Sequence, residues 1–147
     1  MVLISLAPIG LFLVSRIAAW YLAKVIHEMG HVVADYCVSS RILRISVSPF
    51  HVRFRNHKVS MFVGFGLGSF VASQPTKLQG LRWRLLISMA GGPLGSLVGS
   101  VLCFAIPGAA GGRLVEFTWI LGVFSGFHFV WNLLPINGSE ANAFGFC

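Results

Sequence analysis

Long apolar stretches alternate with one polar, strand-like stretch along this chain. Three segments are mainly apolar over about 20 residues or more, the length that a helix needs to cross a bilayer. They comprise residues 4–37, 85–106 and 114–134, and the glycine-rich residues 108–112 form a tight link between the last two. The pattern therefore predicts three transmembrane helices in a single membrane-embedded domain, residues 1–147.

A different pattern occupies residues 41–72, between the first two apolar segments. Residues 42–48 and 51–55 partly alternate between apolar and polar side chains, and residues 59–63 are mostly apolar with a β-branched residue at each end. These features predict short strands. The expected fold is an α-helical polytopic membrane protein with a small β-rich insert between helices 1 and 2. Such strands must be covered by protein or lie at the interface, because unpaired backbone groups cannot face lipid.

Composition supports a bilayer as the environment of the chain. Hydrophobic residues make up 56% of the sequence and charged residues 10%, and the mean hydropathy is +0.81. These values are wrong for a soluble globule of this size and fit a multi-pass membrane protein.

The net charge of +7 is concentrated in the insert rather than spread over a nucleic-acid-binding face. Eight of the eleven Lys and Arg residues lie between positions 41 and 84: Arg41, Arg44, Arg53, Arg55, Lys58, Lys77, Arg82 and Arg84. Basic loops stay on the cytoplasmic side of a membrane. We therefore expect the insert to be cytoplasmic, and we expect no nucleic-acid partner. Among membranes we favour the bacterial inner membrane.

The polar motif His27-Glu28-Met29-Gly30-His31 stands near the end of the first apolar segment. On a helix, residues four apart lie about 6 Å apart along the axis and about 40° apart around it. Both imidazoles can therefore reach one Zn²⁺ ion, and Glu28 is close enough to take a proton from a zinc-bound water. The alternative is a pair of structural histidines, but costly polar groups in a membrane helix usually mark function.

A catalytic zinc needs a third protein ligand, and four residues compete for that role. Glu140 follows the break at Pro135, at the same expected membrane depth as the two histidines, and is the best candidate. His128, one helical turn before Asn132, is its main rival. Asp35 is too far along the helix to share the ion, so we expect either a partner of the zinc site or a solvated helix end. Glu116 is expected to be an interfacial charge on the far side.

These residues together resemble the site-2 proteases, a family of intramembrane zinc metalloproteases. The similarity covers the H-E-x-x-H motif, the sequence Ala-Gly-Gly-Pro-Leu at 90–94 and the N-x-x-P motif from Asn132 to Pro135. In the family an Asp-Gly pair follows, and its Asp falls on Glu140 here. The resemblance implies that His27, His31 and Glu140 hold zinc. It also implies that Asn132 binds the substrate backbone or the developing oxyanion.

The sequence-based hypothesis is therefore a zinc metalloendopeptidase that cleaves in or near transmembrane segments of membrane-protein substrates, with its active site toward the cytoplasm. Glu28 acts as general base. An extended substrate is expected to pair with the edge of the strands at 42–63. Because Glu140-Ala141 replaces Asp-Gly, a catalytically impaired membrane scaffold or adaptor is the alternative. A metal transporter or sensor is a third and weaker hypothesis, because three spans with few acidic residues make a poor ion path.

Overall fold

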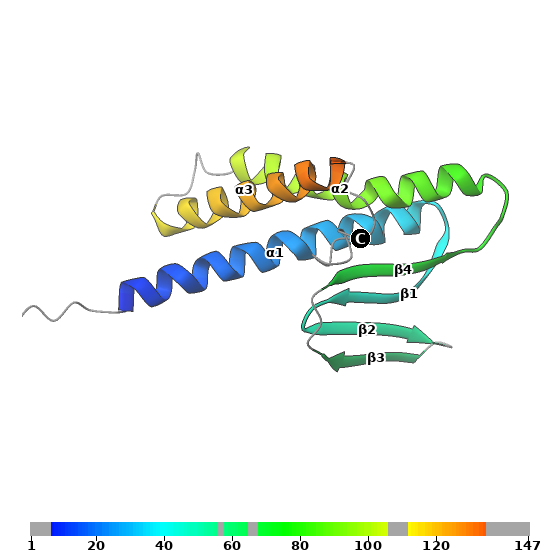
Figure 1. Ribbon diagram of the computed structural model, residues 1–147, viewed down its shortest axis with the longest axis horizontal. Helices are drawn as coiled ribbons and strands as arrows, with labels where there is room; N and C mark the ends of the chain where they lie inside the picture. Colours follow the sequence, from blue (N-terminus) through cyan, green and yellow to red (C-terminus); the bar gives the residue numbers. More distant parts are fainter. Residues whose placement is uncertain (1–6, 56–57, 65–67, 106–111, 135–147) are drawn as a thin grey trace, which may run out of the picture.

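The computed structural model describes residues 7–55, 58–64, 68–105 and 112–134 (Figure 1). The elements in chain order are helix α1 (Ala7–Cys37), strands β1 (Ser40–Val47), β2 (Phe50–Arg55), β3 (Lys58–Val63) and β4 (Ser69–Pro75), and helices α2 (Leu81–Ala105) and α3 (Arg113–Leu133). All three helices are long and apolar enough to cross a membrane. Three apolar helices with a small antiparallel sheet between the first two are what the sequence predicts.

The helix ends follow local chemistry. After α1, Ser39 adopts a positive φ of 56°, the left-handed conformation that commonly ends a helix. Arg84 Nη1 donates a hydrogen bond of 2.6 Å to the carbonyl of Val38 at this end, where a cation is favourable. The residue after α3, Leu134, is extended at φ −73° and ψ 133°, as expected for a residue that precedes proline.

Glycine lets the backbones of α1 and α2 approach closely. A Cβ atom at Gly30 would lie 2.9 Å from the carbonyl carbon of Gly91 and 3.1 Å from Cα of Gly95. Between α2 and α3, a Cβ at Gly126 would lie 3.2 Å from Ser100 Oγ. Small residues at helix contacts are typical of helices that pack in a bilayer, and the repeats Gly95-xxx-Gly99 and Gly122-xxx-Gly126 lie at such contacts.

The helices bury small and polar side chains and expose large apolar ones. The buried apolar cluster contains Ala19, Ala23, Cys103 and Leu121. Ile17 and Val98, in contrast, are more than half exposed. This distribution reverses that of a soluble protein and is what lipid-facing helices show.

The four strands form one antiparallel sheet in the order β3-β2-β1-β4. The predicted strands 42–48, 51–55 and 59–63 correspond to β1, β2 and β3. The sequence analysis missed β4, which extends the sheet beyond the predicted limit at residue 72. β4 pairs with β1 from Ser40↔Pro75 to Val47↔Ser69. It is an edge strand, and it is the strand next to α1 in Figure 1.

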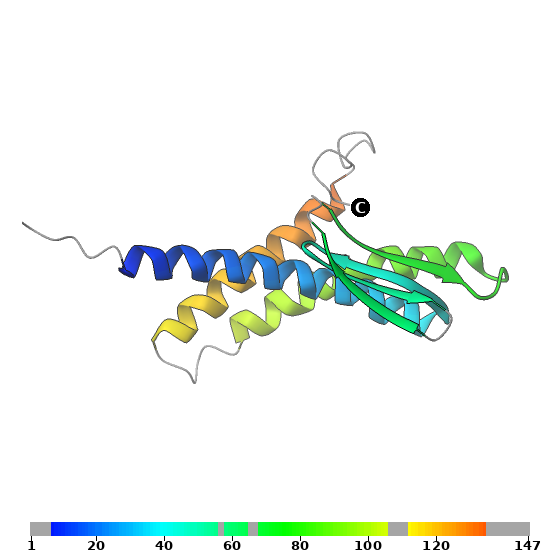
Figure 2. The ribbon, with the colours of Figure 1, turned by 90° about the horizontal axis from the view of Figure 1, so that it is seen from below.

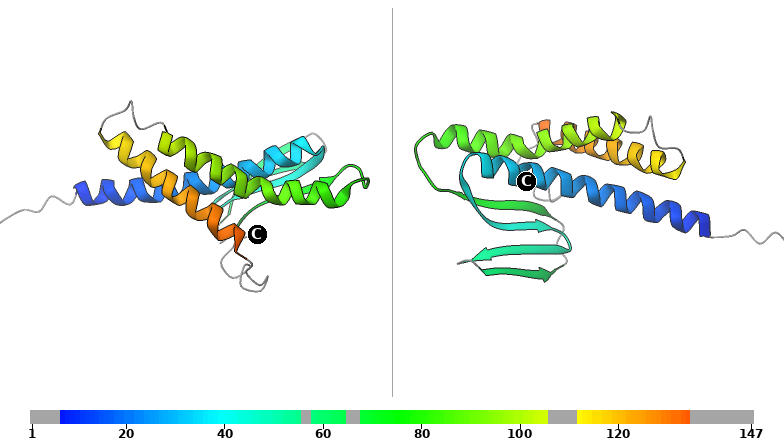
Figure 3. Two further views of the ribbon diagram at one scale, coloured as in Figure 1. Left: turned by 90° about the horizontal axis from the view of Figure 1, so that it is seen from above. Right: turned by 180° about the vertical axis from the view of Figure 1, so that it is seen from behind.

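One side-chain hydrogen bond joins α1 to the sheet: Tyr21 Oη donates to the carbonyl of Val47 at 3.2 Å. A second, from Thr76 Oγ1 to the carbonyl of Ser39 at 2.6 Å, joins the residue after β4 to the turn between α1 and β1. Figure 1 shows the sheet beneath the C-terminal part of α1, and both Figures 2 and 3 show α3 crossing α1 obliquely. The other helices and the sheet thus cover part of the surface of the C-terminal half of α1, whereas its N-terminal part projects away from the sheet.

Candidate metal and catalytic site

The three residues of the H-E-x-x-H motif lie in the enclosed part of α1. His27 and Glu28 are buried and His31 is half-buried. The ring centroids of His27 and His31 are 5.0 Å apart, with the rings nearly perpendicular at 82°. Helix geometry alone predicts this proximity, because the two residues are four positions apart.

Both imidazoles direct Nε2 toward the backbone of α2 at Gly92. A Cβ atom at Gly92 would lie 2.6 Å from Nε2 of His27 and nearer still to Nε2 of His31. The two nitrogens are therefore less than twice that distance apart. One zinc ion bonded to both at about 2.0–2.1 Å would need them within about 4.2 Å of each other. The two nitrogens point to the same place, which makes them candidate ligands of a single ion.

The opposite ring nitrogens are held by polar groups of α2. His31 Nδ1 lies 2.7 Å from the carbonyl oxygen of Ser88. A carbonyl only accepts, so Nδ1 of His31 carries the proton and donates it. The Gly92 N–H also points to this nitrogen, at 3.3 Å, and that contact would require Nδ1 to be unprotonated. We place the proton on Nδ1 because its contact with the Ser88 carbonyl is the shorter of the two. His27 Nδ1 lies 2.9 Å from Ser96 Oγ; this hydroxyl can donate or accept, and it accepts when His27 has the same tautomer as His31.

With Nδ1 protonated, each neutral ring presents the lone pair of Nε2. This is the usual arrangement of metal-binding histidines, whose second nitrogen donates to a carbonyl or another oxygen. The sequence analysis did not identify Ser88 or Ser96. The four-residue spacing of Ser88, Gly92 and Ser96 places three small residues on one face of an apolar helix; this pattern could have indicated Ser96, whereas the Ser88 contact uses the backbone carbonyl and has no signal in the sequence.

Glu28 is only 3% exposed and lies beside a cavity of about 250 Å³. Its carboxylate accepts a hydrogen bond from Ser69 at the start of β4. Its Oε2 atom has no hydrogen-bond partner among the described residues. The cavity is lined by side chains from all three helices and β4: Glu28, His31, Asp35, Val71, Ser88, Met89, Pro93 and Asn132. A buried carboxylate oxygen next to this space can accept a proton from a water in it.

His128 and Asn132 bring α3 to the same site. The buried ring of His128 has its centroid 5.9 Å from that of His27. Asn132 lines the cavity, and its Nδ2 donates to the carbonyl of His128 at 2.8 Å. One amide hydrogen and the amide oxygen of Asn132 are not used by this bond. Both residues therefore lie near the H-E-x-x-H motif.

The third predicted ligand, Glu140, lies outside the described residues. Within the described ranges, no three side chains of His, Cys, Asp or Glu form a group that could hold a metal ion. Among the described residues, His27 and His31 are the two candidate ligands of such an ion.

The structure excludes one of the two roles that the sequence analysis gave Asp35. It is 1% exposed, so it is not a solvated helix end. α1 contacts α2 and the sheet along the face that carries Asp35, whereas Tyr36 on another face is exposed. The sequence analysis expected the substrate-binding edge among the strands at 42–63. The strand that lies beside Glu28 is instead β4, whose Ser69 contacts Glu28 and whose Val71 lines the cavity.

Comparisons of the chain with protein-family models, with curated proteins and with solved structures found no match.

Proposed function

We propose that this protein is a zinc-dependent endopeptidase that hydrolyses peptide bonds in or near the transmembrane segments of other membrane proteins. The observation that carries the proposal is the convergence of the His27 and His31 Nε2 atoms at Gly92, beside the buried carboxylate of Glu28. Two oriented imidazoles and one unpaired carboxylate oxygen at a cavity are the components of metal-assisted hydrolysis.

His27 and His31 would hold the metal through Nε2, with Glu140 as the third ligand that the resemblance to site-2 proteases predicts. His128 is the rival for that position, because its ring lies close to His27. A zinc ion bound there would supply a Lewis acid for the scissile carbonyl and a water that ionises near neutral pH. Ser96 and the Ser88 carbonyl would keep the two rings oriented.

Glu28 performs the proton transfers of the reaction. It takes the proton from the attacking water and gives it to the leaving amine, which must be protonated to depart. Its burial keeps competing solvent away from the carboxylate. Asn132 lines the same cavity, so its remaining amide hydrogen is available to the carbonyl oxygen of the substrate as negative charge develops there.

Peptide substrates must be extended at the site, because the carbonyl groups of a helix accept hydrogen bonds within the helix and are not accessible to the catalytic groups. Among the described residues β4 pairs on one side only, so its other edge is suited to bind them, since backbone groups of an edge strand accept an added strand of any sequence. Ser69 contacts Glu28 and Val71 lines the cavity, so a strand paired with β4 would pass the carboxylate. The basic residues of 41–84 favour a cytoplasmic orientation of this site, and the bacterial inner membrane is the location that we propose for it.

Replacement of Glu28 by Gln tests the mechanism. The Glu28→Gln protein, reconstituted in proteoliposomes with a panel of single-span peptides, is expected to bind zinc with unchanged stoichiometry and to lose cleavage. The matched control is Glu116→Gln, which neutralises an exposed acidic residue at the start of α3 and leaves cleavage intact. Unchanged cleavage by Glu28→Gln would refute the role of this residue.

The replacement of the family Asp-Gly pair by Glu140-Ala141 supports a second candidate, a membrane scaffold or adaptor that retains the metal. Glu140→Asp separates the two functions. If neither the natural chain nor this variant cleaves any peptide of the panel while both bind zinc, the scaffold function replaces the protease function.

A further inference from the structure

Asp35 is a buried carboxylate whose charge has no counterpart in the described part of the chain. The residue is 1% exposed, and its Oδ1 atom is buried without a hydrogen-bond partner. Arg84, a cation on α2, directs Nη1 to the carbonyl of Val38 and Nε to that of Gln79 instead. A buried, unpaired charge is strongly unfavourable, so an unpaired carboxylate at this position calls for a ligand that supplies hydrogen-bond donors.

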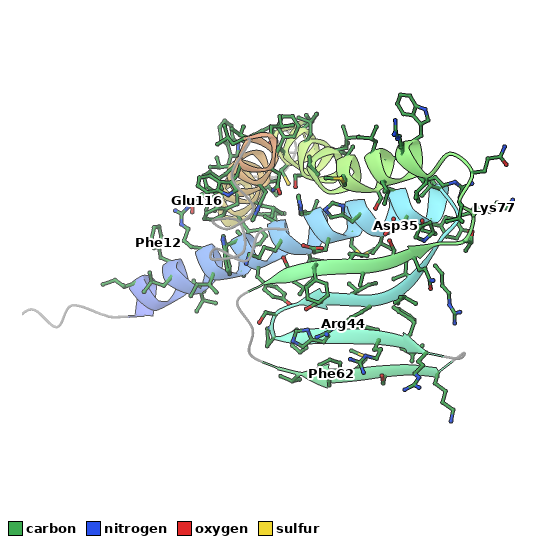
Figure 4. The ribbon with its side chains drawn as sticks, turned by 45° about the vertical axis from the view of Figure 1, so that its right-hand side comes forward. Phe12, Asp35, Arg44, Phe62, Lys77 and Glu116 are labelled. Atoms are coloured by element: carbon green, nitrogen blue, oxygen red, sulfur yellow. The ribbon has the colours of Figure 1, made fainter. Side chains whose placement is uncertain are left out.

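The carboxylate lines the same cavity as the proposed catalytic groups. Asp35, Glu28 and His31 all line a space of about 250 Å³, far larger than the ~10–15 Å³ that one water requires. Asp35 follows Glu28 by seven residues, so it lies on nearly the same face of α1 and about 10.5 Å further along it. Figure 4 shows Asp35 on the part of α1 that passes over β4.

β4 runs beside this part of α1 in the same direction. Ser69 contacts Glu28, Val71 lines the cavity, and Thr76, just past the strand, contacts Ser39 beyond the end of α1. A peptide paired with the edge of β4 would therefore extend from Glu28 toward Asp35. At about 3.3 Å per residue in a strand, 10.5 Å corresponds to about three residues.

We propose that Asp35 is a specificity-determining residue that binds the ammonium or guanidinium group of a substrate Lys or Arg, about three residues from the scissile bond. This inference rests on the proposed protease function. It agrees with the expected orientation, because Asp35 is nearer than Glu28 to the C-terminal, cytoplasmic end of α1. Lys and Arg residues flank the transmembrane segments of membrane proteins on that side.

The test uses single-span peptides that differ at one position, with Lys, Gln or Glu placed two to four residues to either side of the cleavage site. The wild-type protein should cleave the best Lys peptide with a kcat/KM about 10- to 100-fold above that of its Gln counterpart, as a charge-assisted hydrogen bond implies. Asp35→Asn, which preserves size and shape, should abolish this preference, so that the variant cleaves the Lys and Gln peptides with equal kcat/KM. Glu116→Gln should retain the preference.

The inference is overturned if the wild-type protein prefers Lys at no position, or if Asp35→Asn retains the preference. A binding measurement separates this failure from that of the proposed function. Labelled peptides are titrated against Glu28→Gln and against the double variant with Asp35→Asn. If wild-type protein cleaves nothing, the protease proposal fails. Tighter binding of Lys than Gln peptides to Glu28→Gln, lost in the double variant, would still support Asp35 as the cation-binding residue, and equal binding would overturn it.

Discussion

Substitution of Gly92 by Ala tests the metal site without changing any side chain that could bind the metal. The added Cβ would lie 2.6 Å from His27 Nε2, whereas ordinary contact begins at 3.4 Å. His27 Nε2 must therefore move by 0.8 Å relative to the new methyl group, and His31 Nε2 by more. Metal–ligand distances tolerate deviations of only about 0.2 Å.

The expected result is a loss of zinc affinity of about 100-fold, at the upper end of the effects produced when the surroundings of metal ligands are changed. The measurement is a competitive titration of zinc against a chromophoric chelator, with the purified protein in detergent micelles. Helix content should be retained, because alanine is favoured over glycine in a helix interior by about 0.5–1 kcal/mol.

The matched control is Gly10→Ala in α1, where the new Cβ has no neighbour within 4 Å among the described residues. This variant should bind zinc like the wild type. An unchanged zinc affinity in Gly92→Ala would refute the reasoning, because it would mean that the His27 and His31 Nε2 atoms do not form the metal site at Gly92. A loss of affinity accompanied by loss of helix content would point to misfolding, and circular dichroism on the same samples detects it.

Two further substitutions test the contacts between α1 and α2. Ser96→Ala removes the oxygen that lies 2.9 Å from His27 Nδ1 and should weaken zinc binding about tenfold. Its control is Ser100→Ala, which removes a hydrogen bond to the Gly122 carbonyl and should leave the zinc affinity unchanged. Equal effects of the two substitutions on zinc affinity would contradict the role of Ser96. Gly30→Ala places a Cβ against the Gly91 carbonyl group and should lower the free energy of unfolding in a denaturing-detergent titration by about 1–3 kcal/mol, whereas a stabilised protein would show that the helices do not pack as described.

The sequence predicts the helices and the first three strands because their signals are local. Each helix is a long apolar stretch, and β1, β2 and β3 are neighbours joined by short turns. β4 has no such signal: Ser69–Pro75 mixes polar and apolar residues and follows a glycine-rich stretch. It becomes a strand through pairing with β1, with Ser40 opposite Pro75. A local pattern of polar and apolar residues carries no information about pairing with a strand so far away in the chain.

Some features of the candidate site follow from local sequence, and others depend on contacts between distant elements. The proximity of His27 and His31 follows from the helical repeat, so their spacing predicts it. The burial of Asp35 does not follow from its position near a helix end, because it depends on α2 and the sheet covering the last turns of α1. The partners of the two Nδ1 atoms also depend on how α1 crosses α2.

The packing of α1 against α2 also sets the geometry of the proposed metal site at this crossing. Gly30 and Gly91 let the two backbones approach until little more than van der Waals space separates them. At that separation the Ser88 carbonyl and the Ser96 hydroxyl reach the imidazoles. A larger residue at Gly30 or Gly91 would move α2 away and release both rings, although it touches neither. Glycines at this crossing should therefore behave as metal-site residues when they are mutated, and the loss of zinc affinity should follow the volume added between the helices.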